Sequence, residues 1–250
     1  MRIAALYDIH GNLPALEAVL AAIDDEAVDE VVVGGDVLPG PMPTECLACL
    51  RSLELPVRFL GGNGEREVLA AREGRESERL PAGVAEALRW NAAQLSPREA
   101  DFLGSWPATL RLDVGGFGRV LFCHATPHSD SRIFTRRTPE ISLRPAFEGA
   151  EADVVVCGHT HMPFDRTIGA VRVVNAGSVG MPFGEPGAHW LRLGPGVEFR
   201  RTPYDRREAA ERIRATDFPG AAAFADDSVL RPPSEEAMLE AFERAANPEG

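Results

Sequence analysis

The chain has 250 residues, of which 44% are hydrophobic, and a formal net charge of −12 at pH 7. This length suits one globular domain with a sizeable core, or one domain with a short appendage. An acidic chain without a basic stripe disfavours polymeric nucleic acid as a partner. All 26 basic residues are arginine, which argues against P-loop NTPases, kinases and Schiff-base enzymes because each of these needs a lysine.

The chain shows no membrane or export signal, since no apolar run approaches the roughly 18 residues of a membrane span. The first apolar run, residues 2–7, is too short for the core of a signal peptide. We therefore expect a cytoplasmic protein without a membrane partner. Cys46 and Cys49 form an isolated C-x-x-C pattern, which we interpret as two small apolar residues one helical turn apart and not as a zinc site.

The first part of the chain alternates between strands and helices. Residues 2–7, 30–33 and 56–60 read as buried strands. Asn12 is expected to cap the first intervening helix and Thr44 the second. This β-α-β-α-β order predicts parallel strands joined by crossover helices.

The later part of the chain reads as antiparallel strands and a helical tail. Residues 64–106 are charged and Ala-rich and are expected to be mostly helical. Around glycine-containing turns the pattern predicts three hairpins, at 109–114 with 119–123, 164–168 with 171–174, and 188–193 with 197–201. The remaining expectations are a loop at 125–137, a helix at 138–149, a buried strand at 154–157, and helices near 205–215 and 234–246 joined by a linker at 217–233.

These elements together predict an α/β (α+β) fold, in which a two-sheet β-sandwich is flanked by helices. We expect residues 1–202 to form one domain. Residues 203–250 are expected to form a helical C-terminal extension that packs on the same domain.

Polar clusters follow five of the apolar runs. They are Asp8-Ile9-His10, Gly35-Asp36, Gly62-Asn63, His124 and Gly158-His159-Thr160-His161. Because the carboxyl ends of parallel strands meet at one sheet edge, these side chains should lie together. A single His or Asp at a strand end is usually structural, but the combination predicts a set of metal ligands, namely Asp8, His10, Asp36, Asn63, His124, His159 and His161.

Seven carboxylate, amide and imidazole ligands are enough for two divalent ions, and Mn, Fe, Zn, Ni and Co all suit them. Side chains two residues apart in an extended segment point the same way. Asp8 and His10 should therefore converge on one ion, and His159 and His161 likewise. Asp36 is the candidate for a bridging carboxylate. Two ions sharing a site is an arrangement that hydrolyses phosphate esters.

In this order the residues resemble the calcineurin-like metallophosphoesterase superfamily, whose pattern is D-x-H, G-D, G-N-[HDE], H and G-H-x-H. The match covers residues 1 to about 180, and Asn175-Ala176-Gly177-Ser178-Val179-Gly180 is similar to a turn of the small bacterial and archaeal phosphodiesterase-like subgroup. The resemblance implies a dinuclear centre at the edge of the sandwich. It assigns Asp8, His10, Asp36 and His161 to the first ion, and Asp36, Asn63, His124 and His159 to the second.

The resemblance also implies a metal-dependent phosphoesterase. A hydroxide bridging the ions would attack phosphodiesters or activated phosphomonoesters, nucleotides among them. Asn63 and His124 are then expected to be catalytic, and Asn12, Asn63 and Arg132 to contact a small phosphate-ester substrate. A homo-oligomer is compatible with the sequence.

One position departs from the family pattern. Many members carry a His after the metal-binding Asn, where this chain has Gly64. General acid catalysis is typically worth about 10²–10⁴-fold, so another group or a good leaving group is needed, and His128 is the candidate substitute acid. Arg132, Arg136 and Arg137 read either as an anion-binding lid or as a solvated loop.

Two other functions fit the same fold. Some relatives lose metal ligands and act as protein-interaction scaffolds, and a regulator could bind a nucleotide at the metals without hydrolysing it. The complete ligand set favours chemistry over the scaffold. The missing acid keeps the regulator in consideration.

Overall fold

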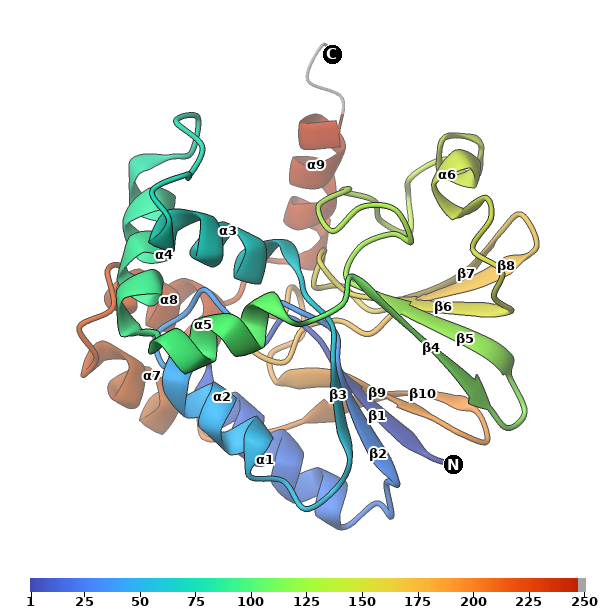
Figure 1. Ribbon diagram of the computed structural model, residues 1–250, viewed down its shortest axis with the longest axis horizontal. Helices are drawn as coiled ribbons and strands as arrows, with labels where there is room; N and C mark the ends of the chain where they lie inside the picture. The colour runs from blue at the N-terminus through green and yellow to red at the C-terminus, as the bar shows by residue number, and fades with distance from the viewer. Residues whose placement is uncertain (247–250) are drawn as a thin grey trace.

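Two mixed five-stranded sheets pack face to face in the computed structural model, which describes residues 1–246 (Figure 1). The first sheet has the strand order β10-β9-β1-β2-β3 and the second β4-β5-β6-β8-β7. The strands are β1 (Ile3–Leu6), β2 (Glu30–Val33), β3 (Val57–Phe59), β4 (Thr109–Val114), β5 (Gly118–Cys123), β6 (Val154–Cys157), β7 (Phe164–Ile168), β8 (Val171–Asn175), β9 (Ala188–Leu193) and β10 (Val197–Thr202).

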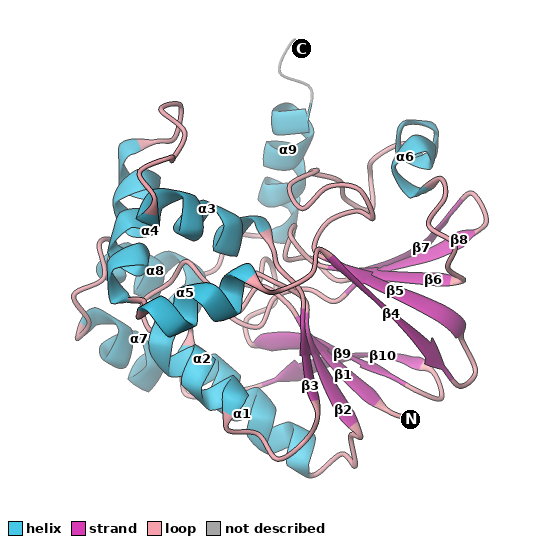
Figure 2. Ribbon diagram, in the orientation of Figure 1, coloured by secondary structure: helices cyan, strands magenta, loops and turns pink. Residues whose placement is uncertain are grey.

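Helices lie outside the sheets (Figure 2). They are α1 (Leu13–Asp24), α2 (Pro43–Arg51), α3 (Asn63–Arg72), α4 (Ala82–Gln94), α5 (Pro97–Gly104), α6 (Glu140–Phe147), α7 (Arg206–Arg214), α8 (Ala221–Phe224), the π-helix η1 (Ala225–Leu230) and α9 (Glu235–Ala246). In the described part of the chain, no helix has both the length and the apolar character needed to cross a membrane.

Strands β1, β2 and β6 are buried on both faces, which explains their apolar runs. Tyr7, Phe122 and Leu191 belong to the core between the two sheets. On the outer faces, Leu16 of α1 packs with the first sheet, and Leu143 of α6 packs with the second. The α/β sandwich with flanking helices that the sequence predicts is confirmed.

The first parallel unit forms as predicted, with one exception. β1 pairs in parallel with β2, and β2 with β3, and the Asn12 side chain caps α1 by accepting from the Ala15 amide at 3.2 Å. The prediction that Thr44 caps the second helix is wrong. α2 begins at Pro43 after Met42 and has no side-chain cap, because proline presets the first-turn φ and has no amide to satisfy.

The segment predicted as a linker, residues 217–233, contains α8 and η1 instead. Ala221, Ala225 and Val229 are buried in a small core with α7 and with Met42 of the first half of the chain. The prediction missed these helices because short Ala-rich turns between prolines carry little periodicity. Through this core the tail contacts the body of the domain.

A hydrogen bond joins the sheets through Tyr7, which follows β1. Its buried hydroxyl donates to the Val156 carbonyl of β6 at 3.0 Å. We expect Tyr7→Phe to lower the free energy of unfolding by about 1 kcal/mol, measured by urea denaturation. The control is Tyr204→Phe, whose half-buried hydroxyl accepts a longer 3.4 Å bond from Asn12. An equal loss of unfolding free energy in both variants would contradict the expected contribution of the bond between the sheets.

Candidate metal centre

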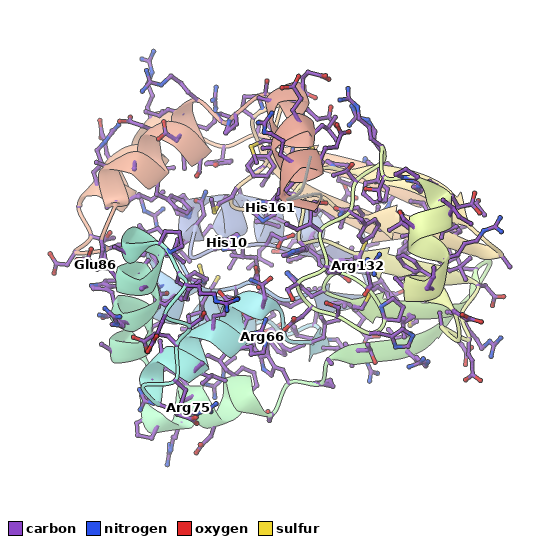
Figure 3. The ribbon with its side chains drawn as sticks, turned by 90° about the horizontal axis from the view of Figure 1, so that it is seen from above. His10, Arg66, Arg75, Glu86, Arg132 and His161 are labelled. Atoms are coloured by element: carbon purple, nitrogen blue, oxygen red, sulfur yellow. The ribbon has the colours of Figure 1, made fainter. Side chains whose placement is uncertain are left out.

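The loops at the carboxyl edge of both sheets bring the predicted ligands together. Six of them form two clusters, and the candidate ligand atoms within each cluster lie within 4.8 Å of one another. The clusters are Asp8, His10 and His161, and Asp36, His124 and His159. Figure 3 shows His10 and His161 side by side, with ring centroids 5.0 Å apart.

The carboxylates of Asp8 and Asp36 each lie near imidazoles of both clusters. Asp8 Oδ1 lies 3.4 Å from His161 Nε2 and 3.8 Å from His124 Nε2. Asp36 Oδ2 lies 3.4 Å from His124 Nε2 and 3.8 Å from His10 Nε2. The two clusters are thus adjacent parts of one centre, and the position of Asp36 suits a bridging carboxylate.

The backbone conformation that makes these side chains converge differs from the extended one that we expected. Asp8, His10, His159 and His161 are not extended but have left-handed φ angles of 54°, 48°, 69° and 57°. Asp8 and His10 still meet in one cluster. His159 and His161 lie in different clusters and do not converge on one point as expected. These two clusters are the ones from which the family resemblance draws its two ligand sets.

Three imidazoles are oriented by backbone carbonyls. The Nδ1 atoms of His10, His124 and His161 lie 3.1, 2.9 and 2.8 Å from the carbonyl oxygens of Pro39, Gly34 and Met181, respectively. A hydrogen bond at Nδ1 leaves Nε2 free to bind a cation, which is how metal-binding histidines are usually held. The engaged Nδ1 atom of His124 suits a ligand better than a proton-transfer group.

The turn after β8 holds Asp8. The Ser178 hydroxyl donates to the Asp8 carbonyl at 2.7 Å, and the Gly180 amide donates to the same oxygen at 3.0 Å. Asp8 Oδ2 accepts from the His159 amide at 2.8 Å. This turn is the segment that resembles the small phosphodiesterase-like subgroup, and its role here is to fix the first ligand.

Glu65 is a residue of the site whose role the sequence interpretation missed. Its Oε1 accepts from the amides of Val37 and Leu38 at 2.7 and 3.2 Å. Its Oε2 accepts from the amides of Asp36 and Gly62 at 2.8 Å each. The carboxylate therefore ties the loop that carries Asp36 to the start of α3. A partial signal was present, because Glu65 stands three residues after the N-cap Gly62, the N3 position from which a carboxylate accepts the N-cap amide.

Burial and close charges shift the pKa values of the centre. Burial disfavours charge on His124, but the carboxylates of Asp36 and Asp8 outweigh it and raise its pKa to about 10. Burial and the neighbouring His124 lower the pKa of His159 to about 4. Burial and Asp36 raise the pKa of Glu65 to about 7. Protons on imidazoles and divalent cations are alternative ways to balance the same buried carboxylates.

Three buried polar atoms at the centre have no hydrogen-bond partner, namely Asp8 Oδ1, Asn63 Oδ1 and His124 Nε2. A buried polar atom without a partner costs about 1–3 kcal/mol, so such atoms point to a missing interaction. All three are good ligands for a divalent cation. The donor set of the two clusters therefore fits two ions, one for each cluster.

Other predicted site residues lie outside this set. The Asn12 amide is occupied as the cap of α1 and by a 2.9 Å bond to the Gly180 carbonyl. His128 is exposed, and its Nε2 lies 3.1 Å from the Glu148 carbonyl oxygen. The Arg132 guanidinium donates to the Ser142 carbonyl at 2.9 Å. None of these contacts involves a residue of the two clusters.

The basic cluster near Arg132 meets the tail of the chain. Arg136 pairs with Glu235, and Arg137 pairs with Glu236 at 2.6 Å. Both glutamates belong to α9, so these partly exposed arginines form ion pairs with the tail of the chain. Phe183 stacks on His161 with centroids 5.0 Å apart and is 6.0 Å from Phe242 of α9. Helix α9 is thus anchored beside the metal centre.

The fold and these ligand clusters define a metallophosphoesterase-type domain. The family model described as calcineurin-like phosphoesterase superfamily domain matches residues 1–193. The chain belongs to this superfamily.

Several prokaryotic proteins are similar to the chain. An uncharacterized protein of Methanocaldococcus jannaschii is 30% identical over 164 residues, which cover 65% of this chain and 63% of the relative. The chain thus matches less than two thirds of that relative's length. A hypothetical protein of Pyrococcus horikoshii has the same fold, with a TM-score of 0.77 at 20% identity over 90% of this chain and 97% of the other. A metallophosphoesterase of Sphaerobacter thermophilus has a TM-score of 0.69 at 26% identity over 92% and 100%.

Gly64, which departs from the family pattern described above, has no room for a side chain. A Cβ atom there would lie 2.0 Å from the Leu38 carbonyl oxygen and 2.8 Å from Asp36 Oδ1. We expect Gly64→Ala to lower the free energy of unfolding by about 1–3 kcal/mol, since the backbone must move.

The matched control is Gly83→Ala in α4, where an added Cβ meets no atom within 4 Å. This change should be neutral or stabilise by about 0.4–1 kcal/mol. Urea denaturation measures both variants. Similar midpoints for the two would contradict the steric argument.

Proposed function

We propose that the chain hydrolyses phosphodiesters or activated phosphomonoesters with two divalent ions. The observation that carries this proposal is the pair of adjacent buried clusters with three unpartnered ligand atoms. When bound, such ions supply positive charge to the phosphate and activate water at neutral pH. Mn, Fe, Zn, Ni and Co each suit the ligands.

The residues of the chain contribute positioning and charge. Asp8 and Asp36 balance part of the cationic charge, and the remaining positive charge favours an anionic ester. The carbonyl-oriented rings of His10, His124 and His161 present Nε2 in fixed directions. Asn63 is the first residue of α3, and its amide would contact both an ion and the phosphate.

The preference for good leaving groups follows from Gly64. No side chain can stand at this position to protonate the leaving oxygen, and the Nε2 atom of His128 is engaged by the Glu148 carbonyl. Without a general acid, esters of acidic alcohols should react faster than alkyl esters. We retain His128 only as a secondary candidate for that acid.

The complete ligand set supports chemistry over a protein-interaction scaffold, which would not need buried unpartnered ligands. A regulator that binds a nucleotide without turnover would use the same residues. It differs from an enzyme only in rate, so the same activity measurement separates the two functions.

We expect Asp36→Asn to reduce hydrolysis of bis(p-nitrophenyl) phosphate by at least about 10²-fold, because the shared carboxylate charge is lost. Metal content, measured by plasma mass spectrometry, should fall from two ions per chain. Asp113→Asn, on the exposed surface of β4, is the control and should change neither quantity. An Asp36→Asn protein that keeps its ions and its rate, or a wild-type rate that survives chelation, would refute the proposal.

A further inference from the structure

A cavity of about 740 Å³ lies beside the metal centre, between α3, α5 and the loop after β5. It reaches the ligand set at His124 and at Gly62, the residue before Asn63. Cavities that bind small organic ligands typically measure about 300–1,000 Å³. This space is larger than a phosphate group needs, so it can hold the organic part of an ester.

One side of the cavity is apolar and partly rigid. Leu69 of α3, Leu103 of α5, Trp106 and Pro127 line it. The indole of Trp106 is stacked on Phe59, with centroids 4.8 Å apart and planes 20° apart. Flat apolar walls of this kind suit a ring system better than a flexible polar chain.

The polar side of the cavity contains a bidentate ion pair between Arg66 and Asp130. Arg66 Nε donates to Asp130 Oδ2 at 2.6 Å, and a terminal guanidinium nitrogen donates to Oδ1 at 3.1 Å. The pair joins α3 to the loop after β5. In Figure 3, Arg66 lies between the centre, marked by His10 and His161, and Arg75 further out. A terminal nitrogen of Arg66 also lies 3.7 Å from Glu67 Oε1. The Arg66 side chain is still 54% exposed, and a guanidinium has five N–H donors, so it can contact a further acceptor.

We propose that this cavity binds the nucleoside part of a nucleotide ester whose phosphate lies at the metal centre. The nucleobase would pack between the apolar walls. The polar groups of the cavity, Ser129 and Asp130 among them, would form hydrogen bonds with the edge of the base. Arg66 would contact the sugar–phosphate region between the two. This inference rests on the proposed function, since it places the phosphate at the metals.

The test measures binding to the metal-loaded full chain by titration calorimetry. The probes are thymidine 5′-monophosphate and methyl phosphate, which share the phosphate and differ in the nucleoside. Wild type should bind the nucleotide at least about tenfold more tightly. Ala108→Trp, at an exposed position that lines the cavity, should fill the space and abolish this preference while leaving methyl phosphate binding unchanged.

The matched control is Ala93→Trp, the same change at an exposed position of α4, which should keep the preference. Circular dichroism and metal content confirm that each variant is folded and loaded. Equal binding of the two probes by wild type, or an unchanged preference in Ala108→Trp, would overturn the inference. So would a loss of methyl phosphate binding in Ala108→Trp equal to that of the nucleotide.

Hydrolysis of bis(p-nitrophenyl) phosphate separates this inference from the proposed function. A nucleotide preference without hydrolysis would reject the phosphoesterase activity and keep the nucleoside cavity. Hydrolysis without the preference would reject the cavity's role and keep the activity.

Discussion

The arrangement of the metal centre depends on a backbone conformation that side-chain-bearing residues rarely adopt. Five of the seven candidate ligands have left-handed φ angles between 48° and 69°, namely Asp8, His10, Asp36, His159 and His161. Such a conformation costs of order 1–3 kcal/mol per residue and persists only where its surroundings enforce it. Here it turns each side chain back toward one point at the sheet edge, which extended strands leaving that edge would not do.

The surroundings that enforce it are hydrogen bonds between neighbouring loops. The Asp8 amide donates to the Gly35 carbonyl at 3.1 Å, and the His10 amide donates to the Asp36 carbonyl at 2.9 Å. The second loop is held in turn by Glu65 of α3, whose carboxylate accepts from three amides of that loop and from the Gly62 amide at the start of α3. The four donors stabilise the charged carboxylate only in part, since burial and Asp36 still raise its pKa. The same bonds tie α3 to the loop of Asp36, so α3 fixes the position of Asp36 as well as that of Asn63.

The strands and the ligand set could be predicted from the sequence, because they depend on local apolar patterns and on the order of the motifs. Buried strands have recognisable apolar runs, and the polar residues after them, such as Asp36 and His124, are found at the predicted edge. Contacts distant in sequence were not predictable in this way. Nothing local shows that Arg137 meets Glu236, 99 residues away, or that the amide of Asn12 bonds Gly180. The cap at Thr44 failed because a helix can begin at a proline without any side-chain cap.

The glycine at position 64 shows how a single departure from a family pattern can belong to the packing of several elements. The loop from Val37 to Gly40 passes over Gly64, and its Leu38 carbonyl occupies the place of a Cβ atom. That loop is held by Glu65 from one side and by Asn91 of α4, whose side-chain oxygen accepts from the Gly40 amide at 3.1 Å. A histidine at position 64 would therefore require the loop, α3 and α4 to move together. The surrounding backbone, and not one residue alone, therefore excludes a side chain at position 64.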